Sequence, residues 1–261
     1  MKDLLKILKD SFVVLKKEPK LFFPKIFLAL LWGFILLYSM NLLVKMQEIT
    51  LIESAELQAA LLKEVFPVTI FLLVLSFFFF LIDSVINSAY PLMIQKYLKK
   101  QDFSVWSSIK QVLQNFFGII LPILIAFLIS FIILIPFTVF FSFSFVSGDS
   151  FLTLISGLVI LVIVFLVTVL FYFIYPVSVI EKKGLASVFS TVRKSFSNAK
   201  EASFGTFIAL ILSLISAFIA SFSETAEITV LALIVFVLLR IITAILATYA
   251  MVLNPMLYFK K

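Results

Sequence analysis

Long apolar runs alternate with short polar segments along the whole chain. The runs cover residues 22–44, 66–91, 116–141, 151–177, 204–222 and 228–258. A helix needs about 20 mostly apolar residues to cross a hydrocarbon core roughly 30 Å thick, and each run is close to that length or longer. Strands of a transmembrane barrel would instead alternate polar and apolar residues. The pattern predicts an all-α integral membrane protein with six transmembrane helices, forming a single membrane domain over residues 1–261.

The polar stretch at residues 179–207 has the period of an amphipathic helix, and two other stretches match it at shifts of 83 and 184 residues. In each copy, five apolar positions share one face of a helix with 3.6 residues per turn. A basic residue also recurs at the corresponding position of each copy. The apolar positions are Val188, Phe189, Val192, Phe196 and Ala199; Val105, Trp106, Ile109, Leu113 and Phe116; and Leu4, Leu5, Leu8, Phe12 and Leu15. The cations are Arg193, Lys110 and Lys9. We expect three amphipathic helices that lie in the plane of the membrane interface.

The spans repeat together with these helices. Every second span ends in a residue–proline pair followed by lysines: Tyr90-Pro91, Tyr175-Pro176 and Asn254-Pro255. The first span of each pair carries small residues at four-residue spacing, which lets helices approach closely in lipid. These small residues are Ala29 and Gly33, Ala126 and Ser130, and Ala209, Ser213, Ala217 and Ser221. Each unit is therefore predicted to be an amphipathic interface helix followed by a two-span hairpin.

The predicted repeat units cover residues 1–101, 102–183 and 184–261. A period this long indicates duplication of a supersecondary unit. Because each unit has two spans, all three insert in the same orientation, as parallel repeats about an axis along the membrane normal. Three such units could close into a pseudo-threefold bundle.

The charges predict the orientation of the chain. The segment up to Lys25, residues 92–115, residues 178–205 and the tail from 256 hold 18 Lys or Arg against 6 acidic residues, whereas the other connections hold 2 Lys against 7. Basic residues are concentrated on the cytoplasmic side of membrane proteins. We expect a multi-pass protein of the cytoplasmic (plasma) membrane with both termini in the cytoplasm. The net charge of +7 is then an insertion signal, and no nucleic acid is expected as a partner.

The stretch "VIEKKGLASVFSTVRKSFSNAKEASFGTF" at residues 179–207 resembles a recurring segment in a broad group of prokaryotic six-span membrane proteins of unknown function. In that group a Pro-marked span exit, an acidic residue and a Gly-Leu/Ala turn precede an amphipathic helix and the fifth span. The group includes the membrane domain fused to some glycerophosphodiester phosphodiesterases. The matching residues are Pro176, Glu181, Gly184, Leu185, Ala186, Arg193, Ser195 and Phe196. The resemblance implies the architecture alone, and no phosphodiesterase activity.

Two full charges, Asp83 and Arg240, lie inside predicted spans. A charge at such depth costs about 2.5 kcal/mol or more, so it usually faces a partner or a wet cavity. Asp83 stands 8 residues and Arg240 15 residues before the proline of its own span, so their alpha carbons would differ in depth by roughly 10 Å. Either they form an ion pair or snorkelled charges that order the bundle, or they mark a binding or permeation site.

Polar positions repeat at the span exits. Asp83, Asn87 and Tyr90 stand 8, 4 and 1 residues before their proline, and the second and third units have counterparts at the same offsets. The counterparts are Thr168, Tyr172 and Tyr175, and then Ala247, Met251 and Asn254. Spacings of four and three place each set on one helix face. The sets either line a polar vestibule near the cytoplasmic side or form interhelical hydrogen bonds.

The interface helices suggest lipid as a partner. Lys9, Lys110, Arg193 and Lys194 would lie near the anionic cytoplasmic leaflet, where each cation gains about 1 kcal/mol from acidic lipids. These four residues are the candidate contacts for lipid headgroups. A homo-oligomer or a second membrane protein stays open as a further partner.

The sequence favours a protein that is not an enzyme. It has no Cys and no His, which removes thiolate nucleophiles, histidine acid–base catalysis and the usual zinc ligands. Walker, HExxH and GxSxG motifs are absent, "SGDSF" at 147–151 fits a turn, and no metal or cofactor is expected. We therefore expect a lipid-interacting or membrane-organising scaffold, with a small-solute or ion transporter or channel using Asp83 and Arg240 as the alternative.

Overall fold

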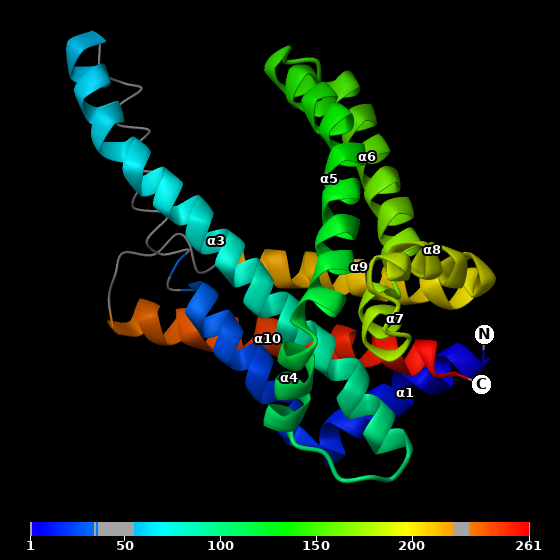
Figure 1. Ribbon diagram of the computed structural model, residues 1–261. Coiled ribbons are helices and arrows are strands. Elements are labelled where there is room, and N and C mark those ends of the chain that lie inside the picture. The colour runs from blue at the N-terminus through cyan, green and yellow to red at the C-terminus, as the bar shows by residue number, and fades with distance from the viewer. Residues whose placement is uncertain (1, 34, 36–54, 222–229, 261) are drawn as a thin grey trace.

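The computed structural model describes residues 2–33, 35, 55–221 and 230–260 (Figure 1). Within these ranges all regular structure is helical and no strand occurs. The helices are α1 (Lys2–Lys17), η1 (Pro19–Phe22), a helix over residues 23–33, α3 (Ala55–Leu98), α4 (Val105–Gln114), α5 (Phe116–Val146), α6 (Ser150–Phe171), α7 (Ile174–Ile180), η2 (Gly184–Ala186), α8 (Ser187–Ser197), α9 (Ala199–Ser221) and α10 (Val230–Tyr258).

Among the described residues, five helical segments are long and apolar enough to cross a membrane. They are Val65–Leu98, Phe116–Val146, Ser150–Ile180, Ala199–Ile219 and Leu233–Tyr258. These segments match the second to sixth predicted spans and confirm an all-α, multi-pass membrane protein. The first predicted span, 22–44, lies partly outside the described residues, although residues 23–33 are helical.

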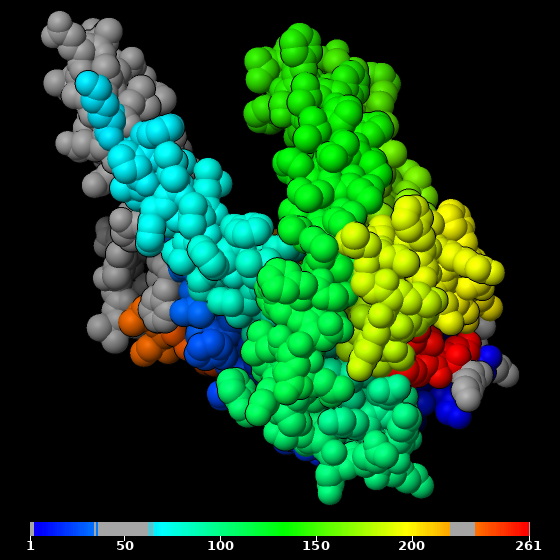
Figure 2. Space-filling model, viewed as in Figure 1, coloured from blue at the N-terminus to red at the C-terminus, as the bar shows by residue number. Residues whose placement is uncertain are grey.

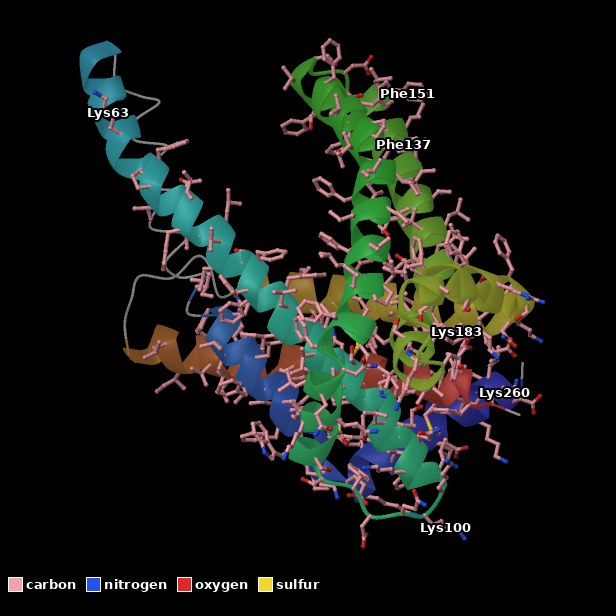
Figure 3. The ribbon with its side chains drawn as sticks, viewed as in Figure 1. Lys63, Lys100, Phe137, Phe151, Lys183 and Lys260 are labelled. Atoms are coloured by element: carbon pink, nitrogen blue, oxygen red, sulfur yellow. The ribbon has the colours of Figure 1, made fainter. Side chains whose placement is uncertain are left out.

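Helix α3 begins at Ala55, well before the predicted start of the second span at residue 66. The added part contains mainly Ala, Leu, Glu and Lys, which are strong helix formers. The helix therefore begins before the apolar run does. Part of the predicted connection at 45–65, from Ala55 onward, belongs to the helix. Figure 3 shows Lys63 near one end of α3 and Lys100, just after its last turn, at the opposite end.

The predicted span 151–177 is broken near its end. Helix α6 ends at Phe171 and α7 begins at Ile174. Pro176 has no N–H group, so it cannot bond to the carbonyl of Tyr172 four residues earlier. The side-chain Nδ2 of Asn254 on α10 donates a hydrogen bond to that carbonyl instead. A neighbouring helix thereby satisfies the group that proline leaves unpaired within the membrane.

The protein core lies where the Pro-marked ends of α3, α7 and α10 pack together. Tyr90 and Met93 of α3, Val177 of α7 and Leu253 of α10 are all fully buried there. Further along the spans, at most 28% of the most apolar stretch of each helix is buried. That much exposed apolar surface is stable in lipid and not in water.

The spans diverge from this core. Helices α5 and α6 form one hairpin and α9 and α10 another, while α3 leaves in a different direction (Figure 1). The space-filling view shows an open notch between the upper part of α3 and the α5–α6 hairpin (Figure 2). Phe80 of α3 and Phe127 of α5 are in contact at the base of this notch, with ring centroids 4.7 Å apart. Above this contact the two arms expose their apolar side chains to the surroundings.

Each amphipathic helix packs against the second span of another predicted unit. Helix α4 packs on α3, α8 packs on α6 and α7, and α1 packs on α10. The first two contacts join elements close in sequence, but the third joins the two ends of the chain. The Tyr249 hydroxyl on α10 donates a 3.0 Å hydrogen bond to the Leu8 carbonyl on α1. The N- and C-terminal ends consequently lie near each other (Figure 1).

The predicted turn at residues 147–151 is confirmed. Gly148 has a φ of +71°, in the left-handed region that favours glycine. The Asp149 carboxylate caps α6 by accepting hydrogen bonds from the backbone N–H groups of Phe151 and Leu152, at 2.9 and 3.0 Å. The polar residues of this motif thus serve the connection between α5 and α6.

Candidate functional site

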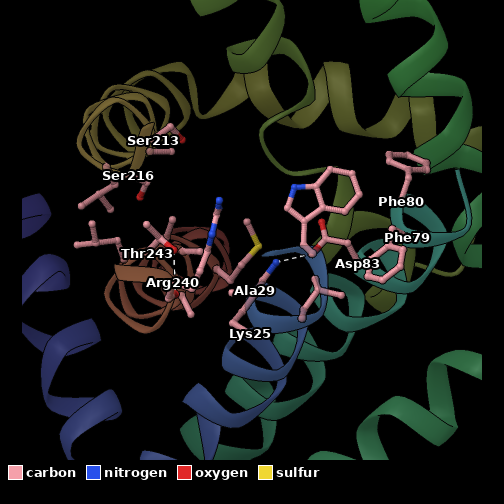
Figure 4. Close-up of a pocket in the computed structure, with 18 of the residues that line it drawn as sticks. Lys25, Ala29, Phe79, Phe80, Asp83, Ser213, Ser216, Arg240 and Thr243 are labelled. Atoms are coloured by element: carbon pink, nitrogen blue, oxygen red, sulfur yellow. Dashed lines mark hydrogen bonds and ion pairs between the residues drawn. The ribbon is translucent and has the colours of Figure 1, made fainter. Parts of the chain in front are cut away.

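A cavity of about 620 Å³ lies between the helix over residues 23–33, α3, α9 and α10 (Figure 4). Its described walls are mainly apolar, with small residues on α9 and α10 and aromatic residues on the other two helices. The charged residues of the described lining are Lys25, Asp83 and Arg240. The two intramembrane charges singled out in the sequence therefore border one cavity, together with a third charge.

Asp83 is paired with Lys25. The Nζ atom of Lys25 lies 2.6 Å from Oδ1 of Asp83, and the Nδ2 group of Asn87 donates to the other carboxylate oxygen at 2.8 Å. The Lys25 side chain is 9% exposed and that of Asp83 is 36% exposed. Lys25 appeared in the sequence as the last cation of a cytoplasmic segment, and its role as the partner of Asp83 was missed. The only signal was its position inside the apolar run "LFFPKIFLAL".

Arg240 lies on α10 and is 7% exposed. Its guanidinium carbon stands 5.1 Å from the centroid of the Phe236 ring, in a cation–π contact. Gly33 allows the helix over residues 23–33 to approach this pair closely, because a Cβ atom there would lie 2.8 Å from the Phe236 ring. The Arg240 side chain extends into the space bordered by Ser213 and Ser216 of α9 (Figure 4).

The remaining predicted polar residues do not border this cavity, and most of them make hydrogen bonds at the helix junctions. Asn87 also donates to the Tyr175 hydroxyl at 3.3 Å, which joins α3 to α7. The Tyr90 hydroxyl donates to the Leu21 carbonyl at 2.8 Å. Thr168 donates to the Val164 carbonyl of its own helix at 2.7 Å. With the Asn254–Tyr172 bond described above, this arrangement favours interhelical hydrogen bonding for Asn87, Tyr90, Tyr175 and Asn254, whereas Thr168 bonds within α6.

Gly205 is a further residue that the sequence did not single out. It lies on α9 opposite the Tyr172 ring, and a Cβ atom at this position would overlap the phenol group. The absence of a side chain therefore lets α9 pack directly on the end of α6. This contact supports the junction that Asn254 also stabilises, since both residues touch Tyr172.

The three amphipathic helices bury some small polar side chains together with apolar ones such as Leu4, Leu15 and Val188, and expose other large apolar side chains. Ser11, Ser108 and Thr191 are fully buried against the spans and donate to the backbone carbonyls four residues before them. The exposed apolar side chains occupy two matched positions in every helix. They are Leu5, Trp106 and Phe189, at 57%, 71% and 81% exposure, and Phe12, Leu113 and Phe196, at 63%, 49% and 68%.

The candidate headgroup cations are not equivalent. Lys9, Lys110 and Arg193 are exposed on α1, α4 and α8. Lys194 is half-buried, with its Nζ atom 5.1 Å from the centroid of the Tyr258 ring. Three of the four residues are thus free to reach a lipid headgroup, while Lys194 also contacts the end of α10.

Glu181, which carries part of the resemblance noted above, lies beside the same end of α10. It is 2.7 Å from Lys183 Nζ and accepts a 3.1 Å hydrogen bond from the Tyr258 hydroxyl. Partial burial disfavours the charged carboxylate, but the hydrogen bonds from Lys183 and Tyr258 and the charges of Lys183 and Lys194 outweigh it. The pKa of Glu181 consequently lies below its usual range.

Comparison of the chain with models of protein families, with curated proteins and with solved structures found no match in any of the three. The resemblance to the six-span group stays a prediction.

Proposed function

We propose that this chain is a non-enzymatic, multi-pass protein of the cytoplasmic membrane that binds and organises lipid at the cytoplasmic interface. The observation that carries the proposal is the matched exposure of two large apolar residues and one cation on each of three amphipathic helices. A soluble protein would bury such residues, whereas a membrane interface accommodates them.

The spacing of these residues suits a lipid interface. In α1, Lys9 follows Leu5 by four residues and precedes Phe12 by three, so the three side chains lie along neighbouring turns of one helix side. Lys110 and Arg193 have the same relation to their apolar neighbours. Apolar side chains at such positions enter the acyl boundary, while the long cationic side chain reaches the phosphate level. Acidic lipids would be favoured by about 1 kcal/mol for each cation.

A six-span ring of three units is part of this proposal. The contact between α1 and α10 supports ring closure, because it places the first amphipathic helix against the last span, as α4 lies on α3 and α8 on α7. In such a ring the three interface helices surround one cytoplasmic face. Both termini would lie on that face, in agreement with the distribution of Lys and Arg.

The two tryptophans allow a direct test, because Trp106 lies on the exposed side of α4 and Trp32 borders the cavity. In a Trp32→Phe variant, Trp106 is the remaining tryptophan. Reconstituted in vesicles with brominated acyl chains, its fluorescence is expected to be quenched most by bromine near the headgroups. Fluorescence that no brominated lipid quenches would refute interfacial seating of α4.

A second quenching experiment tests whether the protein selects acidic lipid. In vesicles of mixed phosphatidylglycerol and phosphatidylcholine, brominating either lipid in turn reports which one gathers around Trp106. We expect phosphatidylglycerol to be enriched, and a Lys9→Gln/Lys110→Gln/Arg193→Gln variant to lose that enrichment. Equal quenching by the two lipids in the unmodified protein would contradict a lipid-organising role.

Transport of a small solute or ion is the second candidate function, favoured by the charged cavity of about 620 Å³. Its test is solute flux into liposomes that contain the protein. Flux that an Asp83→Asn variant abolishes would favour transport over a purely lipid-organising role. Flux of equal rate in the variant would remove Asp83 from the pathway.

A further inference from the structure

We infer that the half-open cavity between the helix over residues 23–33, α3, α9 and α10 binds the head of a zwitterionic amphiphile, a molecule that joins an ammonium group to a phosphate and carries acyl chains. The inference rests on the lipid-binding role proposed above. It names the class of lipid held at a second place, whose described lining includes no residue of α1, α4 or α8. Opposite charges are divided between two walls of this cavity, and that division carries the inference.

One wall of the cavity presents a carboxylate. Asp83 of α3 pairs with Lys25, but the two side chains are unequally exposed, at 36% and 9%. The pair is therefore accessible mainly through its carboxylate. Lys25 and Asn87 bond to different oxygens of this group, which has about four acceptor positions. A further cation can therefore approach Asp83 without displacing either partner.

Aromatic rings border the same wall. Phe79 and Phe80 stand four and three residues before Asp83, so the three side chains lie on one side of α3. Trp32 lies on the neighbouring helix, with its ring centroid 5.5 Å from that of Phe79. All three rings line the cavity. Ring faces attract cations, and alkylated ammonium groups are recognised in this way beside aromatic side chains. This carboxylate wall thus combines the features that bind an ammonium group.

The opposite wall offers hydrogen-bond donors and a cation. Figure 4 shows Arg240, Ser213 and Ser216 on one side of the cavity and Asp83 on the other. The serine hydroxyls can donate hydrogen bonds to a phosphate. Arg240 adds positive charge to this wall while it keeps its contact with the Phe236 ring, because a guanidinium has five N–H donors and can serve several partners at once.

This division of charge selects a zwitterion over a singly charged ligand. The described lining holds two cations and one carboxylate. A ligand with a positive charge alone would meet two like charges. A ligand with a negative charge alone would meet an exposed carboxylate and the faces of aromatic rings. A head that joins both charges can place its ammonium beside Asp83 and its phosphate beside Ser213 and Ser216.

The cavity also suits a ligand with acyl chains. Its walls are mainly apolar and its volume is about 620 Å³. Because the cavity is half-open, chains can extend from it into the bilayer. Asp83 stands 8 residues before Pro91, which is about 12 Å along α3 from the end that the charges predict to be cytoplasmic. A lipid of the cytoplasmic leaflet can therefore bring its head to this depth, whereas a small soluble zwitterion would leave the apolar walls without contact.

Trp32 can report binding directly, because it borders the carboxylate wall. In a Trp106→Phe variant of the full chain, Trp32 is the remaining tryptophan. The protein in dodecyl maltoside micelles is titrated with three lipids that share the same brominated chains: phosphatidylcholine, phosphatidylglycerol and a diacyl trimethylammonium lipid without phosphate. We expect phosphatidylcholine to reach half-maximal quenching at a mole fraction roughly tenfold lower than the other two, since it alone matches both walls. Quenching by either of the others at the same or a lower mole fraction would overturn the proposal.

Substitutions on the two walls should change this preference in different ways. Asp83→Asn removes the charge that attracts the ammonium, so phosphatidylcholine should lose its advantage over phosphatidylglycerol, whereas Asp83→Glu should retain most of it. Ser213→Ala/Ser216→Ala weakens the phosphate wall and should reduce the advantage over the trimethylammonium lipid. This double variant leaves the Lys25–Asp83 pair intact, so it tests the site even where Asp83→Asn does not fold. An unchanged preference in folded Asp83→Asn or in the serine variant would overturn the proposal.

Competition distinguishes a lipid from a free head group. Displacement of brominated phosphatidylcholine by unlabelled phosphatidylcholine, but not by the same concentration of soluble phosphocholine, supports an amphiphile as the ligand. Displacement by phosphocholine as effective as that by the lipid would overturn it, because the acyl chains would then contribute nothing.

The two reporters separate this site from the interfacial role. Equal quenching of Trp32 by the three lipids, with phosphatidylglycerol still enriched around Trp106, would remove the cavity site alone. Loss of that enrichment at Trp106, with the preference for phosphatidylcholine retained at Trp32, would sink the interfacial proposal and leave the cavity site standing.

Discussion

Lys25 and Asp83, 58 residues apart in the chain, form an ion pair with 2.6 Å between Nζ and Oδ1. The pair joins the helix over residues 23–33 to α3 beside the cavity. It explains how a carboxylate is tolerated in the middle of an apolar helix, since a charge at that depth requires a partner. The bond from Asn87 to the second carboxylate oxygen then fixes the orientation of Asp83.

Asp83→Asn should destabilise the protein by about 1–3 kcal/mol, because it leaves the buried Lys25 ammonium without its countercharge. The loss is expected to be lower than for a fully enclosed pair, since the Asp83 side chain is 36% exposed. Unfolding in mixed detergent micelles measures the difference. Lys25→Met/Asp83→Leu removes both charges and should be less destabilised than Asp83→Asn; a larger loss in the double variant would contradict the pairing.

Asn254→Leu should destabilise the protein by about 1–3 kcal/mol, because the Tyr172 carbonyl then loses the donor that replaces the N–H missing at Pro176. In a Pro176→Ala background, residue 176 can donate to that carbonyl itself, and the same substitution should cost less. A double-mutant cycle of unfolding free energies measures this difference. Equal costs in the two backgrounds would show that the hydrogen bond does not serve the proline break.

Gly205→Ala should destabilise the protein by about 1–3 kcal/mol, because the added methyl group overlaps the Tyr172 ring and forces α9 away from α6. Gly157→Ala on α6 is the matched control, since its Cβ atom would meet the Phe141 ring at an ordinary distance of 3.5 Å. We expect this control to be neutral or slightly stabilising, as alanine favours the helix. Thermal unfolding of the two variants compares them; equal losses would exclude the Tyr172 overlap as the cause.

The stability of the protein should fall in acid through Glu181. Its pKa in the folded protein is lowered, so its contribution is fully present above the unfolded-state pKa of about 4.3 and is lost as the pH falls through the folded-state pKa. The melting temperature of Glu181→Gln should therefore depend less on pH below about 4.3 than that of the unmodified protein. If the melting temperatures of the two proteins changed equally with pH over this interval, the role of Glu181 would be contradicted.

The ends of α3 should lie on opposite sides of the membrane. The chain has no natural cysteine, so Lys63→Cys and Lys100→Cys each introduce a single reactive thiol at opposite ends of this helix (Figure 3). In intact cells, a membrane-impermeant maleimide should label position 63 from outside, whereas position 100 should react only after the membrane is opened. Labelling of both positions in intact cells would refute the predicted orientation.

Features that depend on one segment at a time could be predicted from the sequence. The apolar runs located five spans, because the length of a helix that crosses a bilayer is fixed by the thickness of its hydrocarbon core. The period of 3.6 residues located the amphipathic helices α4 and α8, and the glycine and aspartate at 147–151 predicted the turn. Asp83 and Arg240 were identified as unusual because a charge in an apolar run is costly wherever it lies.

The partners of these residues were decided by the tertiary structure. Asp83 pairs with Lys25 and not with Arg240, Asn254 reaches Tyr172 across 82 residues, and Gly205 makes room for the Tyr172 ring. Such contacts depend on how each helix is rotated and how it crosses its neighbours, which the period of a single helix does not specify. The same holds for the amphipathic helices. Periodicity identified their apolar positions, but only packing against the spans determined which of these are buried, as Leu4 and Leu15 are, and which are exposed, as Leu5 and Phe12 are.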